Sequence, residues 1–379
     1  MKRWLLFSLL FFAGVPAMAQ VPKFVPKFIR RMFLEKDTSR RPSFIPIPVI
    51  SYAQETGFEF GGSGLYSFYS DTLDRKTRVS SIFGYATVTT KGQSRLSLST
   101  SYWTPGNRYH YSAGVSYVNF PINFYGIGSD TRLADVDRYG QKRFRASVGG
   151  EKRFGDHIYI GAFAGGFNFD FSVKDSTGIF ATAPGIEGRN GGGSLFFGPS
   201  FTFDNRNSVT YTRRGSYIAA SYSFLQGIFS NNGYHGGQLV IDAAQFIPLS
   251  KKFTLGLNEY SASLFGNEHP FYFMPALGSD ELMRGYYGGR YRDRNYVAAQ
   301  TELRYRLSDR IGVVGFAGTG TVFKDEFSFK KLKPNYGGGL RYFFDVEKGL
   351  SLRLDYGFGE KRPGEVRQKG FYIGLGETF

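Results

Sequence analysis

The chain has 379 residues and a formal net charge of +16, with 50 glycines, 18% aromatic residues and no cysteine. The lack of cysteine excludes a disulfide framework, a thiolate nucleophile and a cysteine-ligated zinc site. After residue 20 no apolar run approaches the roughly 18 residues that a spanning helix needs, which excludes a helical membrane protein.

Residues 1–19 have the pattern of a cleaved export signal. A basic start precedes an apolar stretch over residues 4–15, and the small residues Ala17 and Ala19 follow it. This order is typical of a secretory signal peptide, and the apolar stretch is too short for a membrane anchor. An exported chain does not meet nucleic acid, so the basic charge predicts acidic lipids and lipopolysaccharide as partners.

Residues 20–45 form a short basic leader before the first predicted strand. Apolar residues recur in it at helical spacing with basic residues on the other side, in the set Phe24, Val25, Lys27, Phe28, Ile29, Arg30, Arg31, Met32, Phe33 and Lys36. The pattern is compatible with a short amphipathic helix on the membrane surface and with a disordered leader. The leader is too small to be a domain.

The main domain, residues 46–379, alternates apolar and polar residues in segments of about ten that end in turn residues. The segment at 296–307 places Leu303 and Tyr305 on one face and Glu302, Arg304 and Arg306 on the other. This period of two indicates strands, because a helix repeats near 3.6 residues. Sixteen segments begin near Pro48, Phe58, Thr77, Arg95, Arg108, Lys142, His157, Gly193, Gly215, Gly237, Phe253, Asn295, Ile311, Asn335, Leu350 and Gly370.

The connections between these segments alternate between short and long. Short ones include residues 153–156, 248–252, 308–310 and 345–349, and long ones include 121–140, 172–192, 266–294 and 324–334. Outer-membrane barrels show this asymmetry between periplasmic turns and outer loops. In nearly every strand one face is aromatic and leucine-rich and the other is charged or glycine, which favours a barrel with a wet lumen over a secreted β-sandwich. We predict an all-β fold: a 16-stranded antiparallel transmembrane β-barrel in the bacterial outer membrane.

The long connection at 266–294 carries the compact motif Met283-Arg284-Gly285-Tyr286. An arginine can contact a carboxylate through two nitrogens or stack on rings, and a glycine permits a tight turn beneath it. At this motif the chain resembles the BamA/TamA family of bacterial surface antigen barrels, whose sixth outer loop has a hydrophobic-Arg-Gly-aromatic tip. The resemblance implies that the sixth outer loop folds into the lumen.

Other segments resemble the same family in chain order. The turn after the eighth strand contains Asp204, Arg206 and Asn207 and continues to Arg214 and Gly215, which is similar to the family's periplasmic turn motif. The opening hairpin at 47–58 and the last strands at 337–342 and 352–357 are also similar to the family's. The resemblance spans the whole barrel.

The sequence departs from the family in two respects. Members that assemble or translocate proteins usually carry periplasmic polypeptide-transport-associated domains, for which this chain has no room. The thirteenth strand of the family commonly has an aspartate that helps to hold the loop arginine, and Gly318 stands there instead. We therefore expect Arg284 to pair in the lumen with Glu302, on the inward face of the twelfth strand. The alternative is an ordinary surface arginine.

In the family, the seam between the first and last strands is thought to open laterally. Here the seam joins Val49 and Ser51 to Tyr372, Gly374 and Gly376, and the glycines would weaken the packing of the last strand. The resemblance implies insertion or translocation of proteins, or of lipids, at the outer membrane, with unfolded outer-membrane proteins as clients. The alternative is a passive pore or structural barrel without insertase activity.

Catalytic interpretations have little support in the sequence. The histidines are His110, His157, His235 and His269; their spacing does not suggest a metal site, and His157 and His235 fall in a predicted turn and outer loop. An enzyme in the lumen or outer loops, the third hypothesis, would need a histidine beside a nucleophile or a carboxylate. We predict a non-enzymatic protein that needs no cofactor and no metal.

Overall fold

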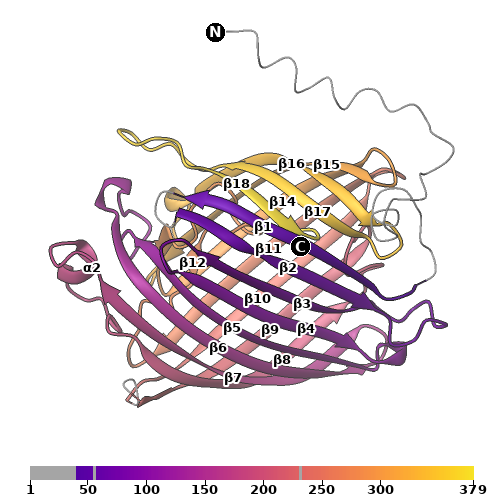
Figure 1. Cartoon of the computed structure of the whole chain (residues 1–379), viewed down its shortest axis with the longest axis horizontal. Coiled ribbons are helices and arrows are strands. Elements are labelled where there is room, and N and C mark those ends of the chain that lie inside the picture. The colour runs from indigo at the N-terminus through magenta and orange to yellow at the C-terminus, as the bar shows by residue number, and fades with distance from the viewer. Residues whose placement is uncertain (1–39, 54–56, 230–232) are drawn as a thin grey trace, which may run out of the picture.

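The computed structural model describes residues 40–53, 57–229 and 233–379, without the side chains of residues 50–53. The predicted signal peptide and residues 20–39 of the predicted leader lie outside this description. The described chain forms one large curled antiparallel sheet (Figure 1).

Sixteen strands form the sheet, and each is hydrogen-bonded to the next in chain order. They are β1 (Ser43–Ala53), β2 (Gly57–Phe68), β3 (Ser80–Thr89), β4 (Ser94–Trp103), β5 (Tyr109–Phe124), β6 (Asp137–Phe154), β7 (Ile158–Val173), β8 (Gly192–Asp204), β9 (Gly215–Ile228), β10 (His235–Pro248), β11 (Phe253–Gly266), β14 (Asn295–Arg306), β15 (Ile311–Phe323), β16 (Lys333–Asp345), β17 (Leu350–Phe358) and β18 (Lys369–Leu375). The two-residue strands β12 (Ala276–Leu277) and β13 (Tyr291–Arg292) pair with each other in the connection between β11 and β14.

The described helices are short. They include α2 (Ile179–Thr182) and 3-10 turns at Pro105–Asn107, Leu133–Asp135 and Phe329–Lys331. In the part of the chain that the structure describes, no helix has the length and apolar character needed to cross a lipid bilayer.

The sixteen predicted segments correspond to the sixteen strands of the sheet, and β1 and β6 differ most from the predicted starts. The first strand begins at Ser43 instead of Pro48, so residues 43–45, predicted as leader, belong to the sheet. Pro46 and Pro48 are compatible with this strand because β1 lies at the sheet edge, where one side needs no backbone donors. β6 begins at Asp137 because its ladder with β5 continues to the pair of Phe124 with Asp137.

Side chains alternate between an exposed face and a covered face of the sheet. In β14, Leu303 is 44% exposed, whereas Glu302 and Arg304 are buried. Large apolar side chains are exposed along the sheet, among them Val115, Val148, Ile160, Phe197, Ile218, Leu257, Leu340 and Ile373. An exposed apolar surface of this extent indicates contact with lipid or with another protein.

The covered face is less polar than the sequence predicted. Phe167 of β7 packs against Phe196 of β8 and Phe273, with ring centroids 5.4 and 4.9 Å apart. A second buried cluster joins Phe124 and Tyr139 to rings from the connections, Phe180 and Phe271. The expectation of a charged or glycine face was wrong here, because the long connections fold back over this face and need apolar partners.

Side chains connect β1 with the end of β16 and the turn that follows it. Among the described residues no backbone ladder connects β1 with β18. Ser43 Oγ donates to Asp345 Oδ2 at 3.3 Å and accepts from Lys348 Nζ at 3.4 Å. An apolar cluster containing Ile45 and Leu350 joins the same regions. Figure 1 shows β1, in indigo, brought round beside the yellow strands near the C-terminus.

Candidate functional site

The connection over residues 267–294, here called the long loop, returns across the covered face of the last strands. Its apolar side chains Leu277, Met283 and Tyr286 are buried against Tyr296 of β14 and Val322 of β15. The small β12–β13 ladder holds the base of the loop together. The part of the loop that contains these residues is therefore packed against β14 and β15.

Arg284 at the tip of the long loop has no exposed surface. Its Nη2 donates to Glu302 Oε1 and its Nη1 to Asp355 Oδ2, each at 2.6 Å. The guanidinium carbon also lies 3.5 Å from the centroid of the Phe316 ring. Charge-assisted bonds of this length, formed in a dry environment, are among the stronger polar contacts in proteins.

Further charged side chains surround this pair and form what we call the arginine hub: Arg284, Glu302, Arg304, Arg341, Arg353, Asp355 and Glu377. Arg304 Nε donates to Glu302 Oε2 at 2.9 Å, and Arg341 Nη1 donates to Asp355 Oδ1 at 2.6 Å. Buried charges are tolerated only when they are paired and hydrogen-bonded, and removal of one partner leaves an uncompensated charge. Loss of any one of these charged side chains would therefore leave a buried charge in the hub without its partner.

The chain after β18 also enters the hub. Gly376 has a φ of +78°, and the residues after it turn towards the covered face. Glu377 accepts from Arg341 Nε at 2.8 Å, and Thr378 Oγ1 donates to Glu302 Oε1 at 2.8 Å. Arg304 Nη2 donates to the backbone oxygen of Phe379 at 2.9 Å.

Gly285 lets the loop tip approach the sheet closely. Its φ is +110°, and a Cβ there would lie 2.5 Å from the carbonyl carbon of Phe358 and 2.6 Å from Gly359 N. The Gly285 amide donates to the Tyr372 hydroxyl at 2.8 Å, so the tip is bonded to β18. Only glycine has both the backbone conformation and the size for this position.

Tyr286 completes the loop tip. Its hydroxyl donates to the Pro334 carbonyl at 2.7 Å and accepts from Glu360 N at 2.8 Å. Burial raises the pKa of the Tyr286 phenol well above its ordinary value, so the group remains a neutral donor. The loop tip is thereby fixed to the start of β16 and to the residues that follow β17.

The structure brings Arg284 and Glu302 together, as predicted from the sequence. It also places Asp355 against Arg284, which was not predicted. A side chain at Gly318 would lie 2.8 Å from the Ala299 carbonyl, so this strand has no room for the family's aspartate. Asp355 of β17 supplies a second acid instead. The alternation in residues 350–358 already placed Asp355 on the polar face, and this was the signal that could have identified it.

The predicted turn motif forms a compact unit after β8. Asp204 is buried and accepts from Arg206 Nη2 at 2.9 Å and from Arg78 Nη1 at 2.8 Å. Asn207 Oδ1 accepts from the backbone amides of Arg213 and Arg214 at 2.9 and 3.0 Å. The side chain of Asn207 therefore closes the turn.

Gly215 follows this turn with a φ of +106°. A Cβ there would lie 2.6 Å from the Asn205 carbonyl oxygen, so β9 can start at this point only with glycine. The residues of the predicted motif thus hold one turn through a buried ion pair, a side-chain bridge and a close backbone contact.

The predicted seam residues lie on the two edge strands, with one exception. Val49 lies opposite Gly61, and Ser51 lies opposite Glu59, although the Ser51 side chain is not described. Tyr372 points to the covered face, where its hydroxyl donates to the Tyr286 carbonyl at 3.3 Å. A Cβ on Gly374 would lie 2.6 Å from Arg353 Nη2, and Gly376 lies beyond the end of β18.

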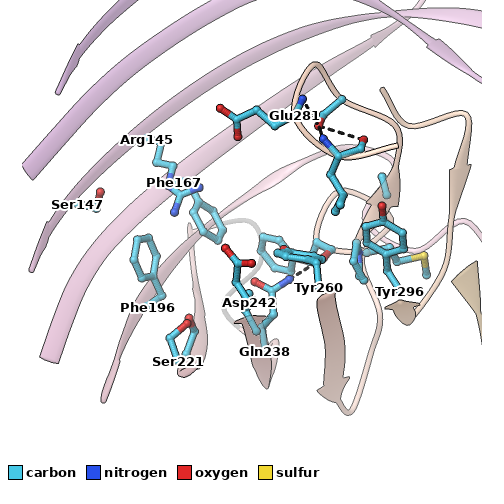
Figure 2. Close-up of a pocket in the computed structure, with 18 of the residues that line it drawn as sticks. Arg145, Ser147, Phe167, Phe196, Ser221, Gln238, Asp242, Tyr260, Glu281 and Tyr296 are labelled. Carbon is cyan, nitrogen blue, oxygen red and sulfur yellow. Dashed lines mark hydrogen bonds between the residues drawn. The ribbon is translucent and has the colours of Figure 1, made fainter. Parts of the chain in front are cut away.

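A chamber of about 760 Å³ remains between the long loop and strands β6 to β11. Figure 2 shows Arg145, Phe167 and Phe196 on one side and Asp242 with Tyr260 nearer the loop. Arg143, which also lines the chamber, has a buried Nε without a hydrogen bond among the described residues. The chamber is thus partly charged and partly aromatic.

The described residues contain no group of three or more histidine, aspartate or glutamate side chains placed to hold a metal ion. His157 is exposed in the β6–β7 turn and His235 is exposed at the start of β10, as the sequence suggested. His110 lies on the covered face and contacts Ser101 and Glu151.

The chain is similar to known proteins in both sequence and fold. Residues 82–379 match the sequence model of the Omp85 superfamily domain. The fold is similar to BamA from Haemophilus ducreyi lacking POTRA domains 1–3, with 14% identity, a TM-score of 0.55, and coverage of 89% of this chain and 70% of that one. CdiB from Acinetobacter baumannii is similar with 12% identity and a TM-score of 0.53, covering 88% of this chain and 59% of CdiB.

CdiB from Escherichia coli is similar with 10% identity and a TM-score of 0.53, and the alignment covers 88% of this chain and 62% of CdiB. The chain therefore spans less than two thirds of either CdiB protein. No curated protein matches the sequence.

Proposed function

Because the chain belongs to the Omp85 superfamily, we propose that it is an outer-membrane barrel that inserts or translocates proteins. The superfamily match covers the strands from β3 onward, and the fold similarity to BamA and CdiB extends over most of the chain. The clients in this proposal are unfolded outer-membrane proteins, and the exposed apolar face contacts lipid and lipopolysaccharide.

In the membrane, the proposed state of the sheet is a barrel closed between β1 and β18. Unpaired backbone groups at a sheet edge cannot face hydrocarbon without a large cost, which favours closure around a lumen. The long loop is then the sixth outer loop and lies inside the lumen, where the arginine hub anchors it. This position explains why seven charged side chains can be buried on one face of the sheet.

The observation that carries the proposal is the junction between the edge strands. Ser43 of β1 is bonded to Asp345 and Lys348, at the end of β16 and in the turn after it, and among the described residues no backbone ladder joins β1 to β18. β18 is also the shortest strand of the sheet, with seven residues. The free energy needed to open a seam with few backbone hydrogen bonds is lower than that needed to separate any other two neighbouring strands. The seam is therefore the place where a client strand can pair.

Photocrosslinking in living cells tests this proposal. A photoreactive residue at Ile373, exposed on β18, is compared with one at Phe197, which is exposed on β8 far from the seam. We expect Ile373 to give protein adducts enriched in nascent outer-membrane chains and Phe197 to give lipid adducts. Lipid-only adducts at both positions would contradict the proposal.

A passive pore is the second candidate, and the chamber of about 760 Å³ favours it. In planar bilayers a lumen filled by the long loop passes little current, whereas an open pore passes a steady one. A high conductance that is unchanged in an Arg284→Ala variant would favour the pore over the insertase.

A further inference from the structure

Three side chains away from the arginine hub form a hydrogen-bonded series on the covered face of β4, β5 and β6. His110 Nε2 lies 2.9 Å from Ser101 Oγ, and His110 Nδ1 lies 3.2 Å from Glu151 Oε2. Strand register produces this arrangement: His110 lies directly opposite Glu151 on one side and Trp103 on the other. Ser101 precedes Trp103 by two positions and therefore shares its face of β4.

The partners determine which atoms carry protons. An ionised carboxylate only accepts hydrogen bonds, so Nδ1 of His110 carries a proton and donates to Glu151. In this tautomer Nε2 carries no proton and accepts from the Ser101 hydroxyl. A nucleophile bonded to a base, with the base oriented by an acid, is the arrangement that activates serine for acyl transfer.

Other contacts hold the acid and the ring in place. Ser200 Oγ and Thr202 Oγ1 donate to Glu151 Oε1 at 3.1 and 3.0 Å, so both carboxylate oxygens are engaged. The His110 ring stacks on Trp103, with centroids 4.0 Å apart and planes within 14°. These contacts leave the imidazole with few orientations, which is the preorganisation that a general base needs.

A cavity of about 340 Å³ lies beside these side chains. Ser101, His110 and Glu151 line it, and apolar Leu65 and Leu350 also contribute to its wall. Its size is within the range of small-molecule sites, at the low end. The walls thus fit a short apolar chain next to the serine.

A guanidinium that can donate to a developing negative charge lines the same cavity. Arg206 uses Nε and Nη2 to hold Asp204, at 3.0 and 2.9 Å. Its Nη1 is not one of the two nitrogens that hold Asp204. A guanidinium N–H aimed at a carbonyl oxygen stabilises the oxyanion that forms in acyl transfer.

We propose that Ser101, His110 and Glu151 hydrolyse short-chain carboxylic esters in this cavity. Ser101 Oγ attacks the carbonyl carbon and its proton passes to His110 Nε2, while Glu151 balances the charge of the ring. The bond between the carbonyl carbon and the alkoxy oxygen then breaks, and the proton on Nε2 passes to the leaving alkoxide. Water hydrolyses the acyl-serine by the same route, which releases a carboxylic acid and restores Ser101.

The proposal does not depend on protein insertion at the seam. Ser101 and His110 are the catalytic residues, Arg206 Nη1 is the oxyanion donor, and Glu151 is a positioning residue that acts through His110. Failure of the crosslinking experiment would leave this proposal unaffected, and its own failure would leave the seam proposal unaffected.

The test uses the full chain in micelles of a neutral detergent. A fluorophosphonate probe, which reacts covalently with activated serines, is applied together with p-nitrophenyl butyrate as an ester substrate. We expect one label per chain, located at Ser101 by peptide mass spectrometry, and steady release of p-nitrophenol. Ser101→Ala abolishes both signals, whereas Ser99→Ala, two positions earlier on the same strand, retains both.

Two further variants separate chemistry from structure. His110→Asn is expected to lower the rate of labelling by about 10²–10⁴-fold, the range for loss of a general base. Glu151→Gln lowers the labelling rate while Glu151→Asp restores part of it, which a purely structural role would not produce. Each variant is accepted only if its heat-dependent gel mobility matches that of the unchanged protein.

One outcome overturns the proposal without any variant. If the folded, unchanged protein carries no fluorophosphonate at Ser101, the serine is not activated. Equal labelling of the unchanged protein and Ser101→Ala overturns it as well.

Discussion

Arg284 and Asp355 are 71 positions apart in the chain, yet Arg284 Nη1 lies 2.6 Å from Asp355 Oδ2. The other terminal nitrogen of the same guanidinium reaches Glu302 on β14. β14 and β17 are not neighbours in the sheet, because β15 and β16 lie between them. One side chain of the long loop therefore links β14 to β17 across the two strands that lie between them.

Replacement of Glu302 by glutamine tests this bridge. Glutamine keeps the shape of the side chain but leaves Arg284 and Arg304 with one buried anion fewer. We expect the free energy of unfolding in urea to fall by about 3–5 kcal/mol, as for other broken buried pairs. The long loop should also become sensitive to protease.

The matched control for Glu302→Gln is Asp170→Asn. Asp170 pairs with Lys142 at 4.0 Å, with both side chains exposed, and such pairs contribute less than about 1 kcal/mol. Equal stability and protease resistance of Glu302→Gln and the unchanged protein would mean that Asp355 alone holds the loop.

Gly285→Ala tests the close approach of the loop tip. A Cβ would lie 2.5 Å from the Phe358 carbonyl carbon, and the φ of +110° is unfavourable for alanine. We expect a loss of at least about 2 kcal/mol, from backbone strain and overpacking together. The measurement is the temperature at which the compact gel mobility is lost.

Gly364→Ala provides the comparison for Gly285→Ala. Gly364 also has a positive φ, +76°, but no heavy atom lies within 4 Å of the Cβ position. Strain alone then costs about 1 kcal/mol. If the two variants lose the same stability, close approach contributes nothing at Gly285.

Asn207→Ala tests the turn after β8. The variant removes the acceptor for the amides of Arg213 and Arg214, and loss of these bonds is expected to cost about 1–2 kcal/mol. Hydrogen exchange at these two amides should accelerate. Asn119→Ala, which removes only a side-chain amide 3.5 Å from the Gly92 carbonyl, should leave exchange at the Arg213 and Arg214 amides unchanged.

Asp345→Ala tests the side-chain junction at the seam. The variant removes the acceptor that Ser43 and Lys348 share at the sheet edge. We expect faster hydrogen exchange in β1 and β18 and no change in β7 or β8. Asp156→Ala, in the exposed β6–β7 turn, serves as the control. Exchange that rises equally in both variants would show that the junction does not hold the edges.

The sequence alone was sufficient to predict the strands and part of the site. Alternation of apolar and polar residues depends only on local geometry, so it located all sixteen strands of the sheet. The proximity of Arg284 and Glu302 was also predicted, because a family motif placed the arginine and the alternation placed the acid on the covered face. Gly285 and Gly215 were also identified, because each belongs to a motif that is similar to one in the family.

The remaining contacts depend on strand register, which a single sequence does not specify. Ser101 and Glu151 lie 9 and 41 positions from His110, and only the pairing of β4, β5 and β6 brings the three together. The same holds for Asp355, whose distance from Arg284 follows from where the long loop returns to the sheet. The aromatic part of the covered face was missed because the folding path of the long connections cannot be read from periodicity.

The arginine hub also has a consequence for the register of the last strand. Glu377 and Thr378 contact Arg341 and Glu302 at 2.8 Å, so the residues after β18 supply part of the counter-charge of the hub. A slip of β18 by one residue would move Glu377 away from Arg341 and leave buried guanidinium groups without that anion. The hub therefore fixes the register of the shortest strand in the sheet.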